Sequence, residues 1–198
     1  MSKQRGRPKL YDSNSALDAA GAVFWSKGFN GTSLDDLATA MSMNRPSIYR
    51  AFGDKETIYR QTLARFSDHM EAAFRRTLLG EPELRTGLRK FYREAVDTYT
   101  GNDGALGCLV MCTAPAAATS HPQVQSDLLS IIQQIDAKVL RRVEQAQAEG
   151  QINTSQDPKQ LAKLVQGVLH SLAIRARAGE SKASLRKFAD SVVAIIID

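Results

Sequence analysis

The chain has 198 residues, of which 43% are apolar and 24% are charged, with 26 Lys and Arg against 21 Asp and Glu and a net charge of +5. The apolar share excludes an intrinsically disordered chain, and the mild positive charge favours a polyanionic partner. No apolar run is long enough to cross a bilayer and nothing resembles a signal peptide, so we expect a cytoplasmic protein.

Residues 1–12 are predicted to form a flexible basic arm. Lys3, Arg5, Arg7 and Lys9 give the first ten residues four cations and no acid. This run resembles the core of an AT-hook, an extended motif whose guanidinium groups lie in the narrow minor groove of A·T-rich DNA. We therefore expect Arg5 and Arg7 to contact the minor groove. The alternative is a disordered, solubilising tail.

Two helices are predicted next in chain order, over about 13–27 and 33–41. The second begins with a cap, because Ser33 can accept a hydrogen bond from the backbone of Asp36, whose carboxylate can bond back to the backbone of Ser33. Each helix carries apolar residues at spacings of three and four. The apolar faces are Leu17, Ala20, Gly21, Phe24 and Trp25 in the first helix, and Leu34, Leu37, Ala38 and Met41 in the second.

A third helix, over about 44–53, has an unusual outward face. Asn44 can cap its start, and Ile48 and Phe52 form a one-sided apolar stripe. The opposite face is polar or cationic, on a helix too short to be stable alone. Such a helix suits a DNA major groove, although an ordinary helical hairpin with a solvated face has the same pattern. The outward residues are Arg45, Ser47, Tyr49 and Arg50.

The rest of the chain is predicted to be helical, which makes the fold all-α. Asp54 can cap a long helix that reaches residue 79. An uncharged stretch over 105–118 is expected to be buried on most sides, with Pro115 kinking or ending its helix. The last two helices carry wide apolar stripes. Besides the stretch over 105–118, the predicted helices cover about 54–79, 83–99, 121–149, 159–177 and 185–197.

The stretch from Gly28 to Tyr59 resembles the DNA-binding domain of the TetR family of transcriptional regulators. Ser42 departs from the family pattern, because it stands where the family has a turn glycine. Serine tolerates a positive φ less readily than glycine, so we expect a slightly different turn there. The matching motifs are Gly28-Phe29, Gly31-Thr32-Ser33, Asp36-Leu37-Ala38, Ser47-Ile48-Tyr49, Phe52 and Asp54-Lys55-Glu56.

The resemblance implies a homodimeric repressor, held on a palindromic operator of double-stranded DNA and released by a small inducer. Residues 13–57 would form a three-helix helix-turn-helix domain, and 58–198 a ligand-binding domain that dimerises through its last two helices. Asn44 is then expected to be a cap rather than a reader, and Arg50 could contact either phosphates or bases. The other implied contacts are Thr32, Ser33, Tyr49 and Lys55 with phosphates, and Arg45, Pro46 and Ser47 with base edges.

The ligand is expected to be small and largely apolar or aromatic, because few charges occur among the residues that helical periodicity assigns to a cavity. We find no Ser-His-acid grouping, no pair of histidines at helical spacing and no Gly-rich phosphate loop. We therefore expect neither an enzyme nor a bound metal or other cofactor. The expected lining is Phe66, Met70, Phe91, Tyr92, Tyr99, Cys112 and His170.

Cys108 and Cys112 are four residues apart and are expected to share one face of a helix. This geometry makes a disulfide between them awkward, and two thiols are too few for a structural metal site. One interpretation is that they are small apolar core residues. The alternative is a repressor that senses oxidants or electrophiles through these thiols, which requires solvent access and a lowered thiol pKa.

Overall fold

The computed structural model describes residues 12–101 and 106–197. Within these ranges every regular element is helical, which confirms the all-α prediction, and none of the helices is long and apolar enough to cross a membrane. The elements are α1 (Ser13–Gly31), α2 (Leu34–Ala40), α3 (Arg45–Phe52), α4 (Lys55–Phe74), a π-helix (Arg75–Leu79), α5 (Leu84–Tyr99), α6 (Leu109–Ala118), α7 (Pro122–Ala148), α8 (Pro158–Arg177) and α9 (Lys182–Ile197).

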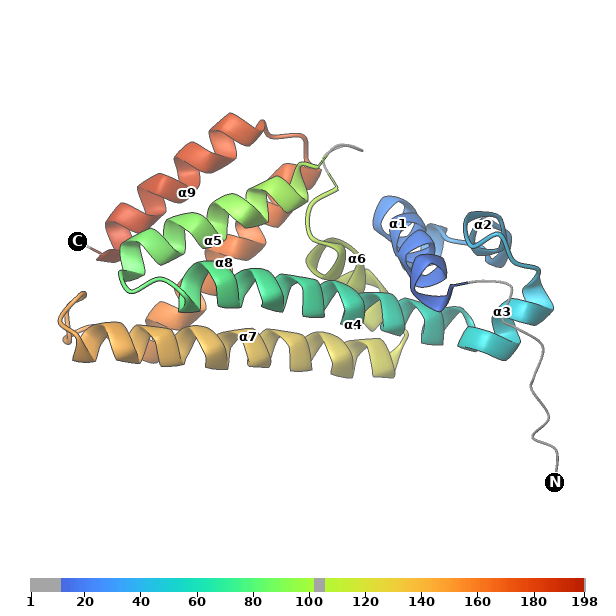
Figure 1. The fold of residues 1–198 in the computed structure, drawn as a ribbon, viewed down its shortest axis with the longest axis horizontal. Coiled ribbons are helices and arrows are strands. Elements are labelled where there is room, and N and C mark those ends of the chain that lie inside the picture. The colour runs from blue at the N-terminus through green and yellow to red at the C-terminus, as the bar shows by residue number, and fades with distance from the viewer. Residues whose placement is uncertain (1–11, 102–105, 198) are drawn as a thin grey trace, which may run out of the picture.

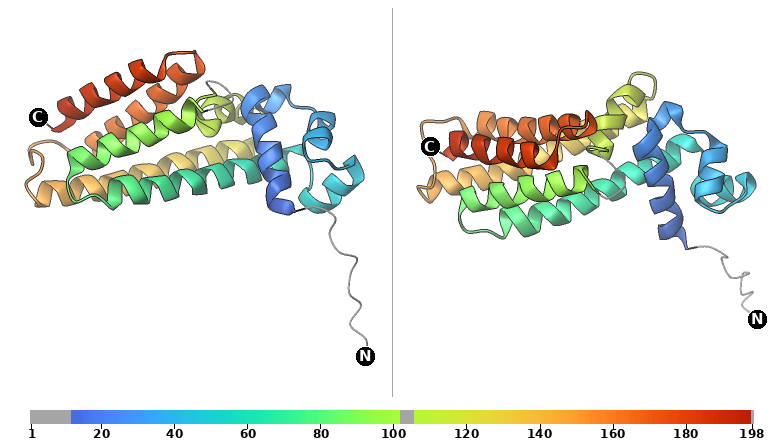
Figure 2. Two further views of the ribbon diagram at one scale, coloured as in Figure 1. Left: turned by 45° about the horizontal axis from the view of Figure 1, so that its top comes forward. Right: turned by 90° about the horizontal axis from the view of Figure 1, so that it is seen from above.

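The molecule is elongated, with α1, α2 and α3 gathered at one end (Figure 1). Helix α4 leaves this end and runs along the body, with α7 beside it, while α5, α8 and α9 complete the body (Figure 2). Helix α6 lies between α1 and the body and packs on both α1 and α7. We call α1–α3 with the first turns of α4 the DNA-binding end, after the domain that this part of the sequence resembles, and the remaining helices the body.

The DNA-binding end and the body share one hydrophobic core. The ring of Tyr59 on α4 is fully buried, with centroids 4.9 Å from Phe24 and 5.0 Å from Phe29 on α1. Its hydroxyl is hydrogen-bonded to the hydroxyl of Thr113 on α6 at 2.6 Å. The ring of His121, which precedes α7, lies 4.6 Å from that of Phe29. The core therefore continues from α1 through α4 into α6 and α7.

Helix α6 begins later than predicted and continues through its proline. It begins at Leu109 rather than near residue 105, because Gly107 has a φ of 68° and Cys108 has an extended backbone. Pro115 lies inside α6 and does not end it. Packing of α6 between α1 and α7 outweighs the loss of one backbone donor, so the helix continues past Pro115 to Ala118, the last residue of the predicted stretch.

The turn between α2 and α3 is formed by a serine in a left-handed conformation. Ser42 has a φ of 52°. Its amide donates to the Thr39 carbonyl at 3.2 Å, and the Met43 amide donates to the Ala38 carbonyl at 3.0 Å. This is the pattern with which helices commonly end at a glycine. These bonds hold the turn, and Ser42 adopts the strained left-handed conformation that glycine would adopt without strain.

Replacing Ser42 with glycine should stabilise the protein, because a left-handed backbone costs a residue with a Cβ about 1–2 kcal/mol, partly offset by the greater freedom of glycine when unfolded. We expect Ser42→Gly to raise the free energy of unfolding by about 1 kcal/mol, measured by urea denaturation. Ser155→Gly, at a turn residue without a positive φ, is the matched control and should not stabilise. Equal effects at both positions would contradict the strain at Ser42.

Candidate nucleic-acid interface

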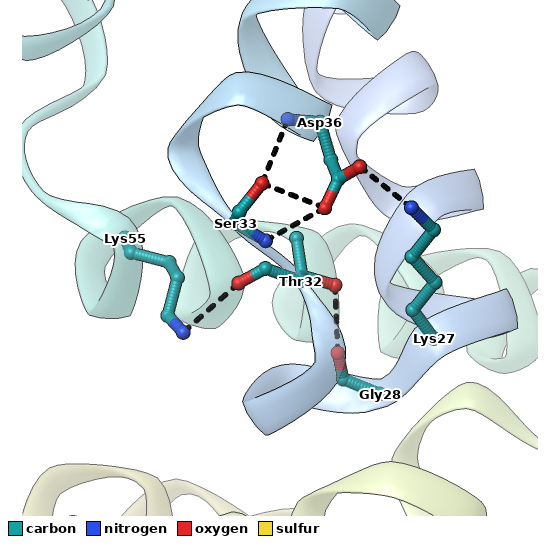
Figure 3. Close-up of polar contacts among 6 residues, drawn as sticks. All are labelled: Lys27, Gly28, Thr32, Ser33, Asp36 and Lys55. Atoms are coloured by element: carbon teal, nitrogen blue, oxygen red, sulfur yellow. Dashed lines mark hydrogen bonds and ion pairs between the residues drawn. The ribbon is translucent and has the colours of Figure 1, made fainter.

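The start of α2 is held by the predicted capping box (Figure 3). The Ser33 hydroxyl accepts from the Asp36 amide at 3.1 Å, and the Asp36 carboxylate accepts from the Ser33 amide and hydroxyl, both at 2.8 Å. Lys27 on α1 donates to the same carboxylate at 2.6 Å. This contact, followed by the bonds from Ser33, lowers the pKa of Asp36. The charged Asp36 therefore ties α1 to α2.

Helix α3 is anchored on one side and free on the other. The Asn44 side chain caps it by accepting from the Ser47 amide at 2.9 Å, as predicted. Ile48 and Phe52 are buried, so the helix is fixed along one edge. Ser47 is half-buried. The exposed side chains of the helix are Arg45, Pro46, Tyr49, Arg50 and Ala51.

Arg45 is engaged by a carboxylate that sequence reasoning missed. Its Nε and Nη2 atoms donate to the two carboxylate oxygens of Asp35 on α2, at 2.8 and 2.5 Å. These hydrogen bonds lower the pKa of Asp35. Both side chains are exposed, so the pair adds little to stability. Its consequence is that Asp35 competes with any base edge for the Arg45 guanidinium.

The predicted phosphate contact Thr32 is not free in this structure. Its side chain is buried, at 2% exposure, and its hydroxyl donates to the Gly28 carbonyl at 2.7 Å (Figure 3). The hydroxyl therefore lacks a proton to offer to a phosphate. Ser33 is exposed but engaged in the capping box. Residues Arg5 and Arg7 of the predicted arm lie outside the described residues.

Lys55, the first residue of α4, holds the segment that connects α1 to α2. Its ammonium donates to the carbonyls of Phe29 and Thr32, both at 3.1 Å, and lies 4.2 Å from the centroid of the Phe29 ring. An ammonium has three protons, so one remains for a phosphate oxygen. Lys55 therefore has a structural role, and one of its protons remains available for the predicted phosphate contact.

A groove of about 970 Å³ lies along the contact of α1 with α4, and the end of α5 and the start of α6 complete its lining. We call it the α1/α4 groove. Its floor includes Trp25 and Phe66, whose ring centroids are 5.1 Å apart, edge to face. Its rim includes the ion pair between Asp18 and Arg65, at 2.6 Å, together with Asp68. The groove has the size and the mainly apolar floor of a small-molecule site.

The predicted ligand residues are not brought together in one cavity. Phe66 lines the α1/α4 groove, whereas Met70 and Phe91 line a space of about 30 Å³ between α4, α5, α7 and α8, too small for a ligand. Tyr92 is fully buried, and its hydroxyl donates to the Val165 carbonyl at 2.9 Å. The structure therefore does not bring these residues together in one cavity, because close packing fills the space between them.

The other members of that predicted set are also packed elsewhere. Tyr99 is 1% exposed, while Cys112 and His170 are half-buried and line neither cavity. Burial lowers the pKa of His170. In the described part of the chain, no group of three or more His, Cys, Asp or Glu side chains is placed to hold a metal ion.

Both cysteines are free thiols. Burial raises the pKa of the Cys108 thiol to about 11. Burial likewise raises the pKa of Cys112, although its half-buried side chain is more accessible. Reactive cysteines have lowered rather than raised pKa values. The geometry therefore favours the interpretation of these residues as part of the packing.

Comparison with known proteins agrees with this architecture along almost the whole chain. Residues 16–62 match the family described as bacterial regulatory proteins, tetR family, and residues 85–192 match the tetracyclin repressor-like C-terminal domain. The HTH-type transcriptional repressor ComR of Escherichia coli (strain K12) is 28% identical over 194 residues, which cover 98% of this chain and 92% of ComR.

Solved structures place a relative on DNA. A cysteine mutant of the TetR family transcriptional regulator CifR, complexed with 26 bp double-strand operator DNA, is 31% identical. The match has a TM-score of 0.82 and covers 97% of this chain and 98% of that one. The reduced form of NemR from E. coli shares the fold, with a TM-score of 0.78 at 18% identity. The chain therefore belongs to the TetR family of DNA-binding transcriptional regulators.

Proposed function

We propose that this regulator is a homodimeric repressor, which binds a palindromic operator and is released by a small, largely apolar ligand. The observation that carries the proposal is the geometry of α3, which is anchored by Ile48 and Phe52 and leaves its basic side exposed. A rigid helix with such a face suits the major groove. Relatives named as a repressor, ComR, and as a regulator on operator DNA, CifR, support the same role. A protein that binds operator DNA must be in the compartment that contains the DNA, which supports the expected cytoplasmic location.

The exposed face of α3 divides into base-reading and phosphate-binding parts. We assign Arg45, Pro46 and Ser47, at its N-terminal end, to base edges, since this end of a recognition helix enters the groove. Phosphate contacts position the protein without reading sequence. Asn44 acts mainly as the cap. The residues assigned to phosphates are Tyr49, Lys55 and Ser33, with Arg50 able to reach either and Arg5 and Arg7 reserved for the minor groove.

Arg45→Ala should relax preference at one base pair in each half-site by about 1–3 kcal/mol, because a bidentate contact to guanine is lost. Binding to variant duplexes measures this preference. Asp35→Asn is the matched comparison, since it removes the competing carboxylate and should strengthen binding while keeping the preference. An Arg45→Ala protein with an unchanged base preference would exclude Arg45 as a reader.

The proposed dimer face is a stripe of exposed side chains on α8 and α9. Leu164 and Ile174 on α8 are 50% and 58% exposed, and Ile195 on α9 is 73% exposed. Gly167 lies between the two α8 residues, and a Cβ there would meet nothing within 4 Å. An exposed apolar stripe with a glycine at its centre allows close approach of a partner helix. A symmetric pair would present two α3 helices to two half-sites.

Selection from a random-sequence duplex pool tests this arrangement, and we expect the wild-type protein to recover a palindrome. Gly167→Arg should give a folded monomer that recovers only a half-site motif, because the open space accepts the side chain until a partner approaches. Ala148→Arg, at an exposed position near the end of α7, is the control and should remain dimeric. A dimeric Gly167→Arg protein would reject this face.

We assign the ligand to the α1/α4 groove, in place of the cavity expected from periodicity. The rings of Trp25 and Phe66 suit a small aromatic or aliphatic compound, and the rim charges can orient a polar substituent. The groove is bounded by α1, which belongs to the DNA-binding end, and by α4, which continues into the body. A ligand that fits best when α1 is displaced would shift the population away from the DNA-binding arrangement.

Ala22 is exposed and lines the groove, so Ala22→Trp should block the ligand while leaving operator binding intact. A library of small aromatic compounds, screened for release of labelled operator from the wild-type protein, supplies the probe. Ala64→Trp, in a groove of about 470 Å³ on the other side of α4, is the control and should respond normally.

The same assay separates this mechanism from thiol sensing. Cys108→Ser and Cys112→Ser should keep the wild-type response, because their raised pKa values oppose reaction at neutral pH. A response that survives in Ala22→Trp but disappears in a cysteine variant would overturn the assignment to the groove.

A further inference from the structure

Arg177, at the last turn of α8, reaches across to the DNA-binding end. One terminal nitrogen of its guanidinium donates to the Trp25 carbonyl of α1 at 2.9 Å and to the Leu106 carbonyl at 3.0 Å. The other donates to the Ser26 carbonyl at 3.4 Å. Within the described residues Arg177 forms no ion pair, and its half-buried guanidinium is directed at backbone carbonyls.

The two α1 carbonyls are available because of a local break in the helix. Gly28 has a φ of 70°, which is not helical, so the turn before it forms a helix end inside α1. Carbonyls at such an end lack their usual partners, and the helix dipole favours a cation beside them. The planar fork of arginine can serve several carbonyls at once, which a lysine ammonium does less rigidly.

A second bond lies beside the first and uses the same tryptophan. The indole Nε1 of Trp25 donates to the Gly107 carbonyl at 3.1 Å. Gly107 has a φ of 68°, and a Cβ there would lie 2.4 Å from the Ala173 carbonyl oxygen and 2.7 Å from the Cys112 Sγ. The backbone before α6 therefore passes closely between α1 and α8, where only glycine fits.

These bonds attach the DNA-binding end at a second point. The first point is α4 itself, with the Tyr59–Thr113 hydrogen bond and the 2.9 Å contact between Glu56 and His121. The apolar packing of α1 on α6 already limits rotation of this end about α4, and directional hydrogen bonds on the α1 side fix its orientation relative to α8. Arg177 is also three residues beyond Ile174 in the proposed dimer face.

We propose that Arg177 is a positioning residue for operator recognition. Through the carbonyls of Trp25, Ser26 and Leu106, it holds the DNA-binding end at a defined angle on α8. Because α8 also forms the proposed dimer face, this angle sets the separation of the two α3 helices. The proposal rests on the proposed dimeric operator, and it assigns half-site spacing, rather than base preference, to a residue outside the helix-turn-helix.

The test compares three classes of duplex by fluorescence anisotropy: the operator selected by the wild-type protein, a single half-site, and operators with one base pair added to or removed from the spacer. Arg177→Met keeps the length of the side chain and removes its donors. We expect its affinity for the full operator to fall about tenfold, equivalent to one or two lost charge-assisted bonds, with half-site affinity unchanged. Discrimination between correct and altered spacers should fall severalfold.

Arg175→Met is the matched control, since it removes the same charge from the same helix. Arg175 pairs with Glu180 at 3.0 Å and lies over the Phe188 ring, without contact to α1 among the described residues. The Arg175→Met protein should therefore retain the spacing preference of the wild-type protein. Gly107→Ala disturbs the second bond from another residue and should reproduce the Arg177→Met behaviour. Thermal melting and light scattering establish that each variant is folded and dimeric.

Two results would overturn the proposal. An Arg177→Met protein with the wild-type preference for spacing would exclude the role, and an equal loss on half-sites and full operator would indicate damage to the helix-turn-helix instead. Hydrogen exchange at the Gly107 amide, which donates to the Tyr99 carbonyl at 3.0 Å, reports the attachment without DNA and should accelerate in Arg177→Met. A third combination is informative: the wild-type protein shows no spacing preference, yet exchange at Gly107 still accelerates in Arg177→Met. That result would reject the dimeric operator, and with it the spacing role, while retaining the attachment.

Discussion

Burial of Tyr59 at the junction of α1, α4 and α6 is the constraint on which the rest of the structure depends. Its ring contacts two aromatic rings of α1, and its hydroxyl bonds to Thr113. Burial raises the pKa of Tyr59 to about 12, so the hydroxyl keeps its proton at neutral pH. Close-packed interiors transmit displacement. In the proposed mechanism, a movement of the body would therefore displace α1, and DNA binding would act back on the body through the same contacts.

Three cations of the DNA-binding end have partners inside the free protein. Lys27 and Arg45 pair with neighbouring carboxylates, and Lys55 bonds to two carbonyls. These contacts give each side chain a defined direction before DNA arrives. In the proposed complex, Arg45 would exchange Asp35 for a base edge, so the net gain in binding free energy is smaller than its charge suggests. The proposal therefore makes affinity sensitive to Asp35, which touches no base in that complex.

The α1/α4 groove and the Arg177 attachment meet at Trp25. The Trp25 ring lines the groove, its indole N–H bonds to Gly107, and its carbonyl accepts from Arg177. A ligand that displaces this ring would act on the same bonds that hold α1 to α8. The proposed ligand site and the proposed control of spacing are thus linked through one side chain, without a long chain of intermediates between them.

Local interactions were determined by the sequence alone. The caps at Ser33, Asn44 and Asp54 and the buried edge of α3 depend on groups within four residues of one another, so their spacing is sufficient to predict them. Periodicity also identified the apolar faces, but not which faces pack without a void, and for that reason it did not show that the predicted lining residues are divided between two cavities and the core. Only the tertiary structure decided the Asp35–Arg45 pair, the α1/α4 groove and the reach of Arg177 to a carbonyl 152 residues away. These features depend on distances between helices, which no local pattern in the chain encodes.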